Sequence, residues 1–285
     1  MTMFGFGLVL AAAFCHAIWN FFVKRLNDGP ELVWLFSLIS VGLYLPVAII
    51  ILITTASSFG FRQVAFIAGS AMLHLGYFLL LQQGYRRGDL SLVYPTARAT
   101  GPLLSTTLAV VLLGEKMTYQ IAAGGVAIIL GVLFLTGGFK QGGKKIGTSI
   151  LFGLGVGILI SSYTVWDAFS VSALMVPPLL LDYASSIGRT ILLAPIAARR
   201  KKLVSGYWQE HRLGVIAIAV FSPLAYILVL YALTFTPVIY VAPTREVSVL
   251  ITVLMGSVWL GEGDLRRRML WATLIVFGVA LLATA

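Results

Sequence analysis

Long apolar segments recur along this chain from one end to the other. A helix needs about 20 mostly apolar residues to cross a bilayer, and ten segments approach or exceed that length. Short breaks rich in glycine, proline, serine or charge separate them, and such breaks belong at or beyond the membrane interfaces. The pattern predicts an all-α membrane protein with ten transmembrane helices. The segments cover residues 3–24, 32–54, 64–85, 91–113, 119–137, 148–169, 178–198, 212–234, 238–260 and 268–284.

Composition agrees with a membrane protein and argues against a nucleic-acid partner. The chain is 59% hydrophobic and only 11% charged, whereas a soluble domain carries about 25% charged residues. The net charge of +10 alone could suggest a polyanion as partner. The basic residues lie in short loops between apolar segments, however, where the positive-inside rule of membrane topology explains them. We therefore expect the protein to associate with the lipid bilayer and not with nucleic acid.

Three landmarks recur at an offset of 147 residues, which indicates a chain built from two copies of one unit. We expect the first repeat over residues 1–138, a cytoplasmic linker over 139–147 and the second repeat over 148–285. Each repeat holds five spans, an odd number, so the second enters the membrane inverted relative to the first. The three landmark pairs are Arg98 and Arg245, Gly114-Glu115 and Gly261-Glu262, and Trp19-Asn20 and Trp166-Asp167.

The distribution of Lys and Arg predicts the orientation. The odd-numbered loops carry 15 of the 17 basic residues outside the spans, and the even-numbered loops carry only Arg62 and Lys116. Since cytoplasmic loops are enriched in Lys and Arg, the odd loops should be cytoplasmic. Both termini are then expected outside, on the periplasmic side of a bacterial inner membrane.

Two inverted five-helix repeats with these motifs resemble the drug/metabolite transporter superfamily, specifically its EamA-type exporters. The resemblance covers the whole chain. It rests on Pro95-Thr96-Ala97-Arg98, on Pro243-Thr244-Arg245-Glu246, and on the Gly-Glu pair that closes each of these spans. Among members of the superfamily, the chain looks most like bacterial exporters of amino acids, including aromatic ones. The resemblance implies a central path lined by the fourth and ninth spans.

Arg98 and Arg245 are the first candidates for a substrate site. A charge inside the bilayer is costly, so it normally faces a cavity or a partner. Each arginine could meet a substrate carboxylate bidentately. Each could equally cap carbonyls freed by the nearby proline or pair with a carboxylate of the scaffold, and the sequence leaves both interpretations open.

Aromatic and polar side chains on other spans complete the predicted substrate path. In the first and sixth spans they follow i, i+3, i+4 spacing, which places them on one helix face, although Trp near a helix end also suits the interfacial belt. Asp167 is also a candidate for proton coupling, although the Glu that small multidrug pumps of the superfamily carry in their first helix has no counterpart here. The path candidates besides the arginines are His16, Trp19, Asn20, His74, Tyr77, Phe78, Gln82, Tyr94, Tyr163, Trp166, Asp167 and Tyr226.

Four prolines are candidate hinges: Pro95, Pro102, Pro237 and Pro243. Proline removes a backbone donor and clashes with the preceding helical turn. Interruptions at corresponding places in two halves indicate a transporter's binding site. The same prolines could instead produce static kinks that widen a cavity.

The remaining motifs point away from an enzyme. The three histidines lack metal-ligand spacing, and the chain has no phosphate-binding loop for ATP, so we expect no metal and no cofactor. The sequence favours a secondary transporter of small metabolites, with amino acids as the expected substrates. We expect it to export them by alternating access and to work as a monomer. A broad drug or nucleotide-sugar-like carrier is the alternative within transport, and a membrane-embedded lipid enzyme is the alternative outside it.

Overall fold

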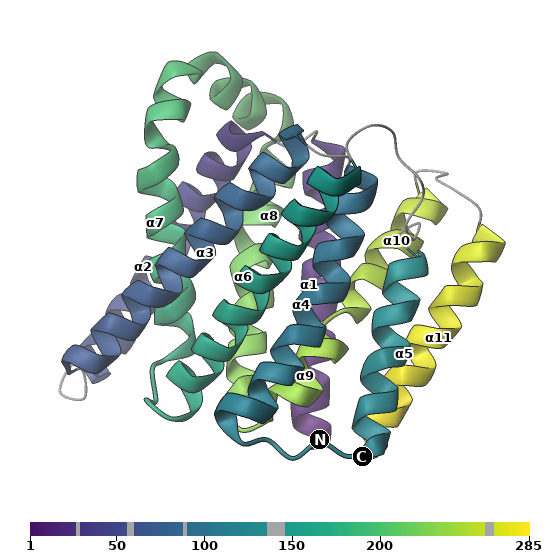
Figure 1. Ribbon diagram of the computed structural model, residues 1–285. Helices are drawn as coiled ribbons and strands as arrows, with labels where there is room; N and C mark the ends of the chain where they lie inside the picture. The colour runs from purple at the N-terminus through teal and green to yellow at the C-terminus, as the bar shows by residue number, and fades with distance from the viewer. Residues whose placement is uncertain (27–28, 56–59, 88–89, 136–145, 260–264) are drawn as a thin grey trace.

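The computed structural model describes residues 1–26, 29–55, 60–87, 90–135, 146–259 and 265–285, and these residues form eleven α-helices without a strand (Figure 1). The helices of the first half are α1 (Met3–Arg25), α2 (Pro30–Thr55), α3 (Phe61–Arg87), α4 (Leu90–Leu113) and α5 (Tyr119–Leu135). Those of the second half are α6 (Ile146–Ser172), α7 (Pro178–Arg199), α8 (Lys201–Leu233), α9 (Val238–Thr244), α10 (Val247–Trp259) and α11 (Leu265–Thr284).

The helices have the length and surface that a bilayer requires. Seven of those within the described residues, α1 to α4 and α6 to α8, are long and apolar enough to cross a membrane, and α5 and α11 are shorter apolar helices. Large apolar side chains such as Ile50, Ile53 and Val111 are exposed on the outer faces, where lipid can cover them. The prediction of an all-α membrane protein is confirmed, with α9 and α10 together forming the ninth of the ten spans.

The chain termini and the basic run at the junction of α7 and α8 lie at opposite ends of the bundle. Figure 1 shows both termini at the same end, as an even number of spans requires. The basic run Arg199–Lys202 lies at the opposite end, where α7 meets α8.

Residues 199–211, which we expected to form a loop, are helical in the structure. Only Arg200 separates α7 from α8, and α8 bends at His211, whose φ of −134° and ψ of 26° are not helical. The basic residues had suggested a loop, but apolar residues recur there every three or four positions, at Leu203, Val204, Tyr207 and Trp208. That spacing is typical of an amphipathic helix.

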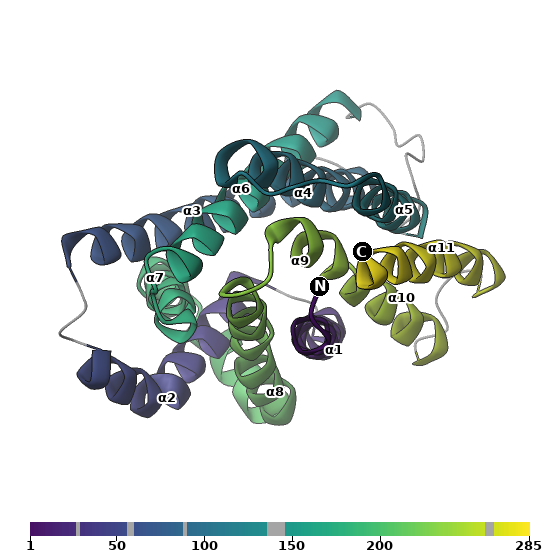
Figure 2. The same ribbon diagram turned by 90° about the horizontal axis from the view of Figure 1, so that it is seen from below.

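Helix contacts follow the two-fold relationship between the halves. The contact of α4 with α6 has its counterpart in the contact of α10 with α1, and the contact of α3 with α6 has its counterpart in that of α8 with α1. The pairs α2–α7 and α5–α11 each join equivalent helices of the two halves. The short helix α9 lies at the centre and contacts α1, α4, α5, α6, α8 and α11 (Figure 2).

The two proline-containing spans differ, although the sequence predicted an interruption in both. Helix α4 continues unbroken through Pro95 and Pro102, whereas the ninth span stops at Thr244 and restarts at Val247. At this break the backbone forms i→i+3 hydrogen bonds, from Glu246 N–H to Pro243 O (3.0 Å) and from Ser248 N–H to Arg245 O (3.1 Å). The equivalent of Glu246 in α4 is Ala99, a strong helix former with no charge to satisfy.

Glu115 joins the two halves. Its carboxylate accepts hydrogen bonds from the backbone N–H groups of Val238 (2.8 Å) and Ile239 (2.9 Å), the first residues of α9. Helix N-termini hold unsatisfied donors and favour negative charge. Gly114, at φ +69°, ends α4 and lets the chain turn so that Glu115 reaches them.

Glycines bring α5 and α11 into close contact. A Cβ added at Gly278 would lie 2.6 Å from the carbonyl oxygen of Gly124, and a Cβ added at Gly131 would lie 2.5 Å from Ile275 Cγ1. Small residues at such crossings let helix backbones approach within a membrane. This contact fixes the fifth and tenth spans to each other at one edge of the bundle (Figure 2).

Candidate functional site

A buried carboxylate, Asp167 on α6, is the centre of a polar cluster formed by three helices. The side chain is fully buried. Its Oδ2 accepts a hydrogen bond from the hydroxyl of Tyr226 on α8 and lies 3.0 Å from Nε2 of His74 on α3. Its other oxygen, Oδ1, has no hydrogen-bond partner among the described residues.

Aromatic rings enclose this carboxylate. His74 stacks on Tyr163 with ring centroids 4.1 Å apart, and it meets Tyr226 edge to face at 5.0 Å. Tyr77 packs edge to face on Tyr163 at 5.6 Å. The structure thus brings five predicted path residues, from α3, α6 and α8, into one group that we call the tyrosine cluster: His74, Tyr77, Tyr163, Asp167 and Tyr226.

A second polar group forms between the two halves of the chain. Nη1 of Arg98 on α4 lies 3.2 Å from Oε1 of Glu246, which sits between α9 and α10. Nε of Arg98 also donates a longer hydrogen bond (3.4 Å) to the hydroxyl of Tyr94, one turn earlier. Of the two interpretations left open by the sequence, Arg98 therefore matches the pairing with a scaffold carboxylate.

Arg245 is in a different situation from Arg98. Its side chain is only 7% exposed, and no hydrogen bond or ion pair of its guanidinium is found within the described residues. Its charge lies close enough to interact with Tyr163, Tyr226 and Glu246. Arg98 lies within electrostatic range of Arg245, whose neighbour Glu246 pairs with Arg98.

Away from their first and last residues, the predicted apolar segments contain as many basic as acidic residues. Three arginines, Arg98, Arg189 and Arg245, accompany three acids, Asp167, Asp182 and Glu246. Arg189 donates to Ser186 Oγ (3.0 Å) and interacts with the charge of Asp182 without a direct contact. Arg245 and Asp167 likewise make no direct contact with an opposite charge within the described residues, apart from the histidine beside Asp167.

Other predicted path residues lie away from this centre. Trp166 donates from its indole N–H to the carbonyl oxygen of Phe66 (2.9 Å) and stacks on that ring, so it fastens α6 to α3. Trp19 donates to His16 Nδ1 (3.1 Å) and, like Phe78, packs against an apolar cluster between α1, α2 and α8.

The remaining predicted residues fall into three kinds. Asn20 is half-buried on α1. His16 lies within electrostatic range of both Arg98 and Arg245, which places its ring near the polar centre. The side chain of Gln82, like that of Pro95, is outside the described part of the chain.

Two of the four hinge candidates and one missed residue lie around the break in the ninth span. Pro237 immediately precedes α9, and Pro243 is buried inside it. Pro102 is buried within continuous α4. Glu246 was not among the predicted site residues, although a carboxylate within an apolar span is itself a signal, because it needs a partner there.

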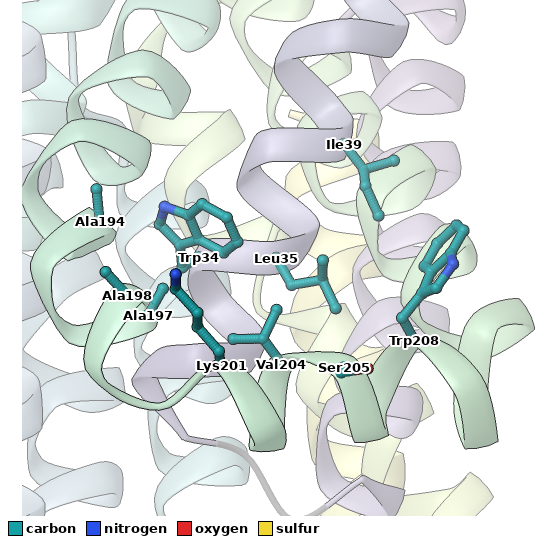
Figure 3. A pocket seen from close by; sticks show the side chains of 10 residues that line it. All are labelled: Trp34, Leu35, Ile39, Ala194, Ala197, Ala198, Lys201, Val204, Ser205 and Trp208. Carbon is teal, nitrogen blue, oxygen red and sulfur yellow. The ribbon is translucent and has the colours of Figure 1, made fainter.

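A surface pocket of about 660 Å³ lies elsewhere, between α2, α7 and the start of α8. Figure 3 shows Trp34 and Trp208 on different sides of it and Lys201 extending beside Trp34. The lining is mostly apolar and comes from the end of the bundle that carries the basic run. None of the buried charges lines this pocket, so it is not the polar site described above.

The described residues contain no group of three or more His, Cys, Asp and Glu side chains arranged to hold a metal ion. The residues at the centre offer hydrogen bonding, charge pairing and aromatic contact.

Comparison with known proteins identifies the chain. The model of the EamA-like transporter family matches residues 3–137 and 147–284. A solved structure described as "Crystal structure of protein" superposes with a TM-score of 0.72 and 14% identity, covering 98% of this chain and 96% of that one. None of the curated proteins compared matches the chain. The match over both halves shows that this chain belongs to the EamA-like transporter family, and it is accordingly a multi-pass membrane transporter of small molecules.

Proposed function

We propose that this chain is a secondary transporter that exports amino acids, including aromatic ones, across the bacterial inner membrane. The observation that carries the proposal is the position of Arg245. This arginine is nearly buried at the break between α9 and α10, beside a group of tyrosines, and has no hydrogen bond within the described residues. Because an unpaired charge inside a membrane protein is costly, a substrate carboxylate is the natural partner.

The surroundings of Arg245 suit the rest of an amino acid. The rings of Tyr77, Tyr163 and Tyr226 can contact an apolar or aromatic side chain. A guanidinium can bind a carboxylate through two parallel hydrogen bonds, which fixes the orientation of the ligand. His16 and Tyr94 extend the proposed path from this centre, and Trp19 and Asn20 lie further along α1.

The break in the ninth span supports alternating access. A short stretch of i→i+3 hydrogen bonds inside a longer helical span often marks a hinge, and Pro243 removes one backbone donor just before it. The centre is nearly closed to solvent, since Arg245 is 7% exposed and the His74 side chain 15%. A substrate therefore has to be admitted by movement of the helices, and we assign that movement to the segment from Pro237 to Val247.

The proposal includes the organisation inferred from the sequence. The moving units are the repeats at 1–138 and 148–285, joined by the linker at 139–147. The end of the bundle that carries the basic run Arg199–Lys202 faces the cytoplasm, so both termini are periplasmic. One chain contains both repeats, so a monomer suffices.

A broad drug or nucleotide-sugar carrier is the nearest rival. A nucleotide-sugar needs several cations for its phosphates, and here Arg98 is already paired with Glu246. At the break between α9 and α10, the one guanidinium without a hydrogen bond within the described residues suits a single carboxylate better than a diphosphate.

The test is transport in proteoliposomes that contain the purified protein. Vesicles are loaded with unlabelled phenylalanine, and the entry of radiolabelled phenylalanine is followed by exchange, which needs no coupling ion. We expect Arg245→Gln to slow this exchange at least tenfold, a loss of about 1.4 kcal/mol in transition-state stabilisation, and Arg245→Lys to restore only part of it.

Arg62→Gln is the matched control, because Arg62 is exposed at the start of α3 and should leave exchange unchanged. The proposal fails if the unsubstituted protein exchanges none of the twenty amino acids. It also fails if Arg245→Gln exchanges phenylalanine at the normal rate while eluting as a folded species.

A further inference from the structure

The unused oxygen of Asp167 is the starting point. Oδ2 is occupied by Tyr226 and His74, whereas Oδ1 is fully buried without a partner among the described residues. A buried acceptor that lacks a hydrogen bond costs free energy in the empty protein. A donor supplied by a ligand removes that cost, so the site favours a ligand with a hydrogen-bond donor at this place.

The surroundings of Asp167 favour a cationic donor. Three aromatic rings, those of His74, Tyr163 and Tyr226, lie around the carboxylate. The negative charge of the carboxylate and the electron-rich faces of aromatic rings both attract an ammonium group. Asp182 on α7 adds a further negative charge within electrostatic range of Asp167 and His74, and Arg189 partly offsets it.

Arg245 completes the arrangement. The tyrosines Tyr163 and Tyr226 that flank Asp167 are also within the electrostatic range of Arg245. Asp167 Oδ1 is a negatively charged acceptor, and the Arg245 guanidinium is a positively charged donor. Neither has a hydrogen-bond partner within the described residues, and both lie beside the rings of Tyr163 and Tyr226. A zwitterion presents the complementary pair of charges.

The other buried charges are arranged differently. Asp182 and Arg189, both on α7, interact with each other's charge. Arg98 and Glu246 are 3.2 Å apart and neutralise each other. Glu246 Oε2 is also without a partner in the described residues, but its carboxylate already faces a guanidinium, so the pair attracts an ammonium less than Asp167 does.

We propose that Oδ1 of Asp167 accepts a hydrogen bond from the ammonium group of the substrate while Arg245 binds its carboxylate, so the site selects zwitterions. This inference rests on the proposed function and specifies its ligand. The equivalent position in the first repeat is Asn20, 147 residues earlier, which has no negative charge. The ammonium site therefore exists in one repeat only, and the chain binds one zwitterion at a time.

The wild-type protein provides the first test, without any substitution. In detergent, labelled phenylalanine is displaced by 3-phenylpropionate, which lacks the ammonium, and by phenethylamine, which lacks the carboxylate. We expect each analogue to bind at least tenfold more weakly than phenylalanine. Equal binding of phenylalanine and 3-phenylpropionate would overturn the ammonium site and leave the proposed function standing, whereas binding and exchange of no amino acid would overturn both.

Two variants then test which residue binds each charged group of the substrate. Asp167→Asn keeps the shape and the acceptor for Tyr226, and it should weaken phenylalanine binding at least tenfold while 3-phenylpropionate binds within twofold of its normal affinity. Arg245→Gln should show the opposite selectivity, with phenethylamine unaffected. Glu210→Gln, at an exposed position on α8, is the control and should bind all three ligands normally.

A rival role for Asp167 predicts a different pattern. If Asp167 only carries a proton, Asp167→Asn binds and exchanges phenylalanine normally and loses transport driven by a pH gradient, and that result overturns the proposal. An equal loss of phenylalanine and 3-phenylpropionate binding in folded Asp167→Asn also overturns it, because the residue would then support the site without contacting the ammonium.

Discussion

Neutralising Glu246 should destabilise this protein severely, because it leaves the guanidinium of Arg98 without a counter-charge. The pair joins α4 of the first half to the break between α9 and α10 in the second. Both side chains are largely buried, with 13% of Arg98 and 1% of Glu246 exposed, so solvent replaces little of the lost interaction. Removing one partner of a buried ion pair costs about 3–5 kcal/mol.

A double variant distinguishes the loss of the counter-charge from the general cost of substituting a buried residue. Replacing both members by methionine removes the uncompensated charge as well as the pair, and such replacements are often neutral or stabilising. We therefore expect Glu246→Gln to lower the unfolding midpoint by about 10 °C, and the double variant Arg98→Met, Glu246→Met to recover most of that loss.

The assay is thermal unfolding of the detergent-solubilised protein, followed by the monodisperse fraction on size exclusion at a fixed heating time. Glu210→Gln is the control, because Glu210 is 75% exposed and 4.0 Å from His211, and such a surface substitution changes stability by about 0.5 kcal/mol or less. A midpoint for Glu246→Gln within 2 °C of the unsubstituted protein (an effect of about 1 kcal/mol or less) would refute the reasoning. So would a double variant less stable than Glu246→Gln.

Three further substitutions and one fusion test other features. Glu115→Ala removes two hydrogen bonds from the start of α9 and should cost about 2 kcal/mol, measured as a lower unfolding midpoint; an unchanged midpoint contradicts this capping role. Gly278→Ala should separate α5 from α11 and reduce the yield of folded protein, whereas Gly125→Ala, where an added Cβ meets nothing nearer than 3.8 Å, should not; equal yields count against the close crossing. Pro243→Ala should slow exchange more than it weakens phenylalanine binding, and the reverse indicates a static kink. Alkaline phosphatase fused after Ala285 should be active, since it is exported only if the terminus is periplasmic; an inactive fusion means the opposite orientation.

Much of the fold could be predicted because the membrane restricts the alternatives. Only helices and closed barrels satisfy the backbone in lipid, so apolar length alone predicted nearly every span. The segment 199–211 was the exception, because its charges suggested a loop while its apolar residues followed a helical period. The break at Arg245 and Glu246 was predicted in both halves and occurs in one.

The site was harder to predict because its members meet across helices. The residues of the tyrosine cluster were all among the predicted path residues, but the sequence did not predict that they contact one another. The partner of Arg98 was not predicted, because Glu246 lies 148 positions away and the sequence holds no distances between helices. Trp166 was assigned to the path by its spacing, yet its indole N–H bonds to the backbone of α3. Periodicity shows which residues share a face, but not which neighbour that face meets.

The balance of charge inside the spans has a consequence for energetics across a polarised membrane. Moving one elementary charge through 100 mV changes the free energy by about 2.3 kcal/mol, so a carrier with an unbalanced interior would be driven toward one side by voltage. Away from the ends of the predicted apolar segments, three arginines stand against three acids, and the proposed zwitterionic substrate adds no net charge. On the proposed mechanism, the empty and occupied forms reorient with little dependence on the membrane potential.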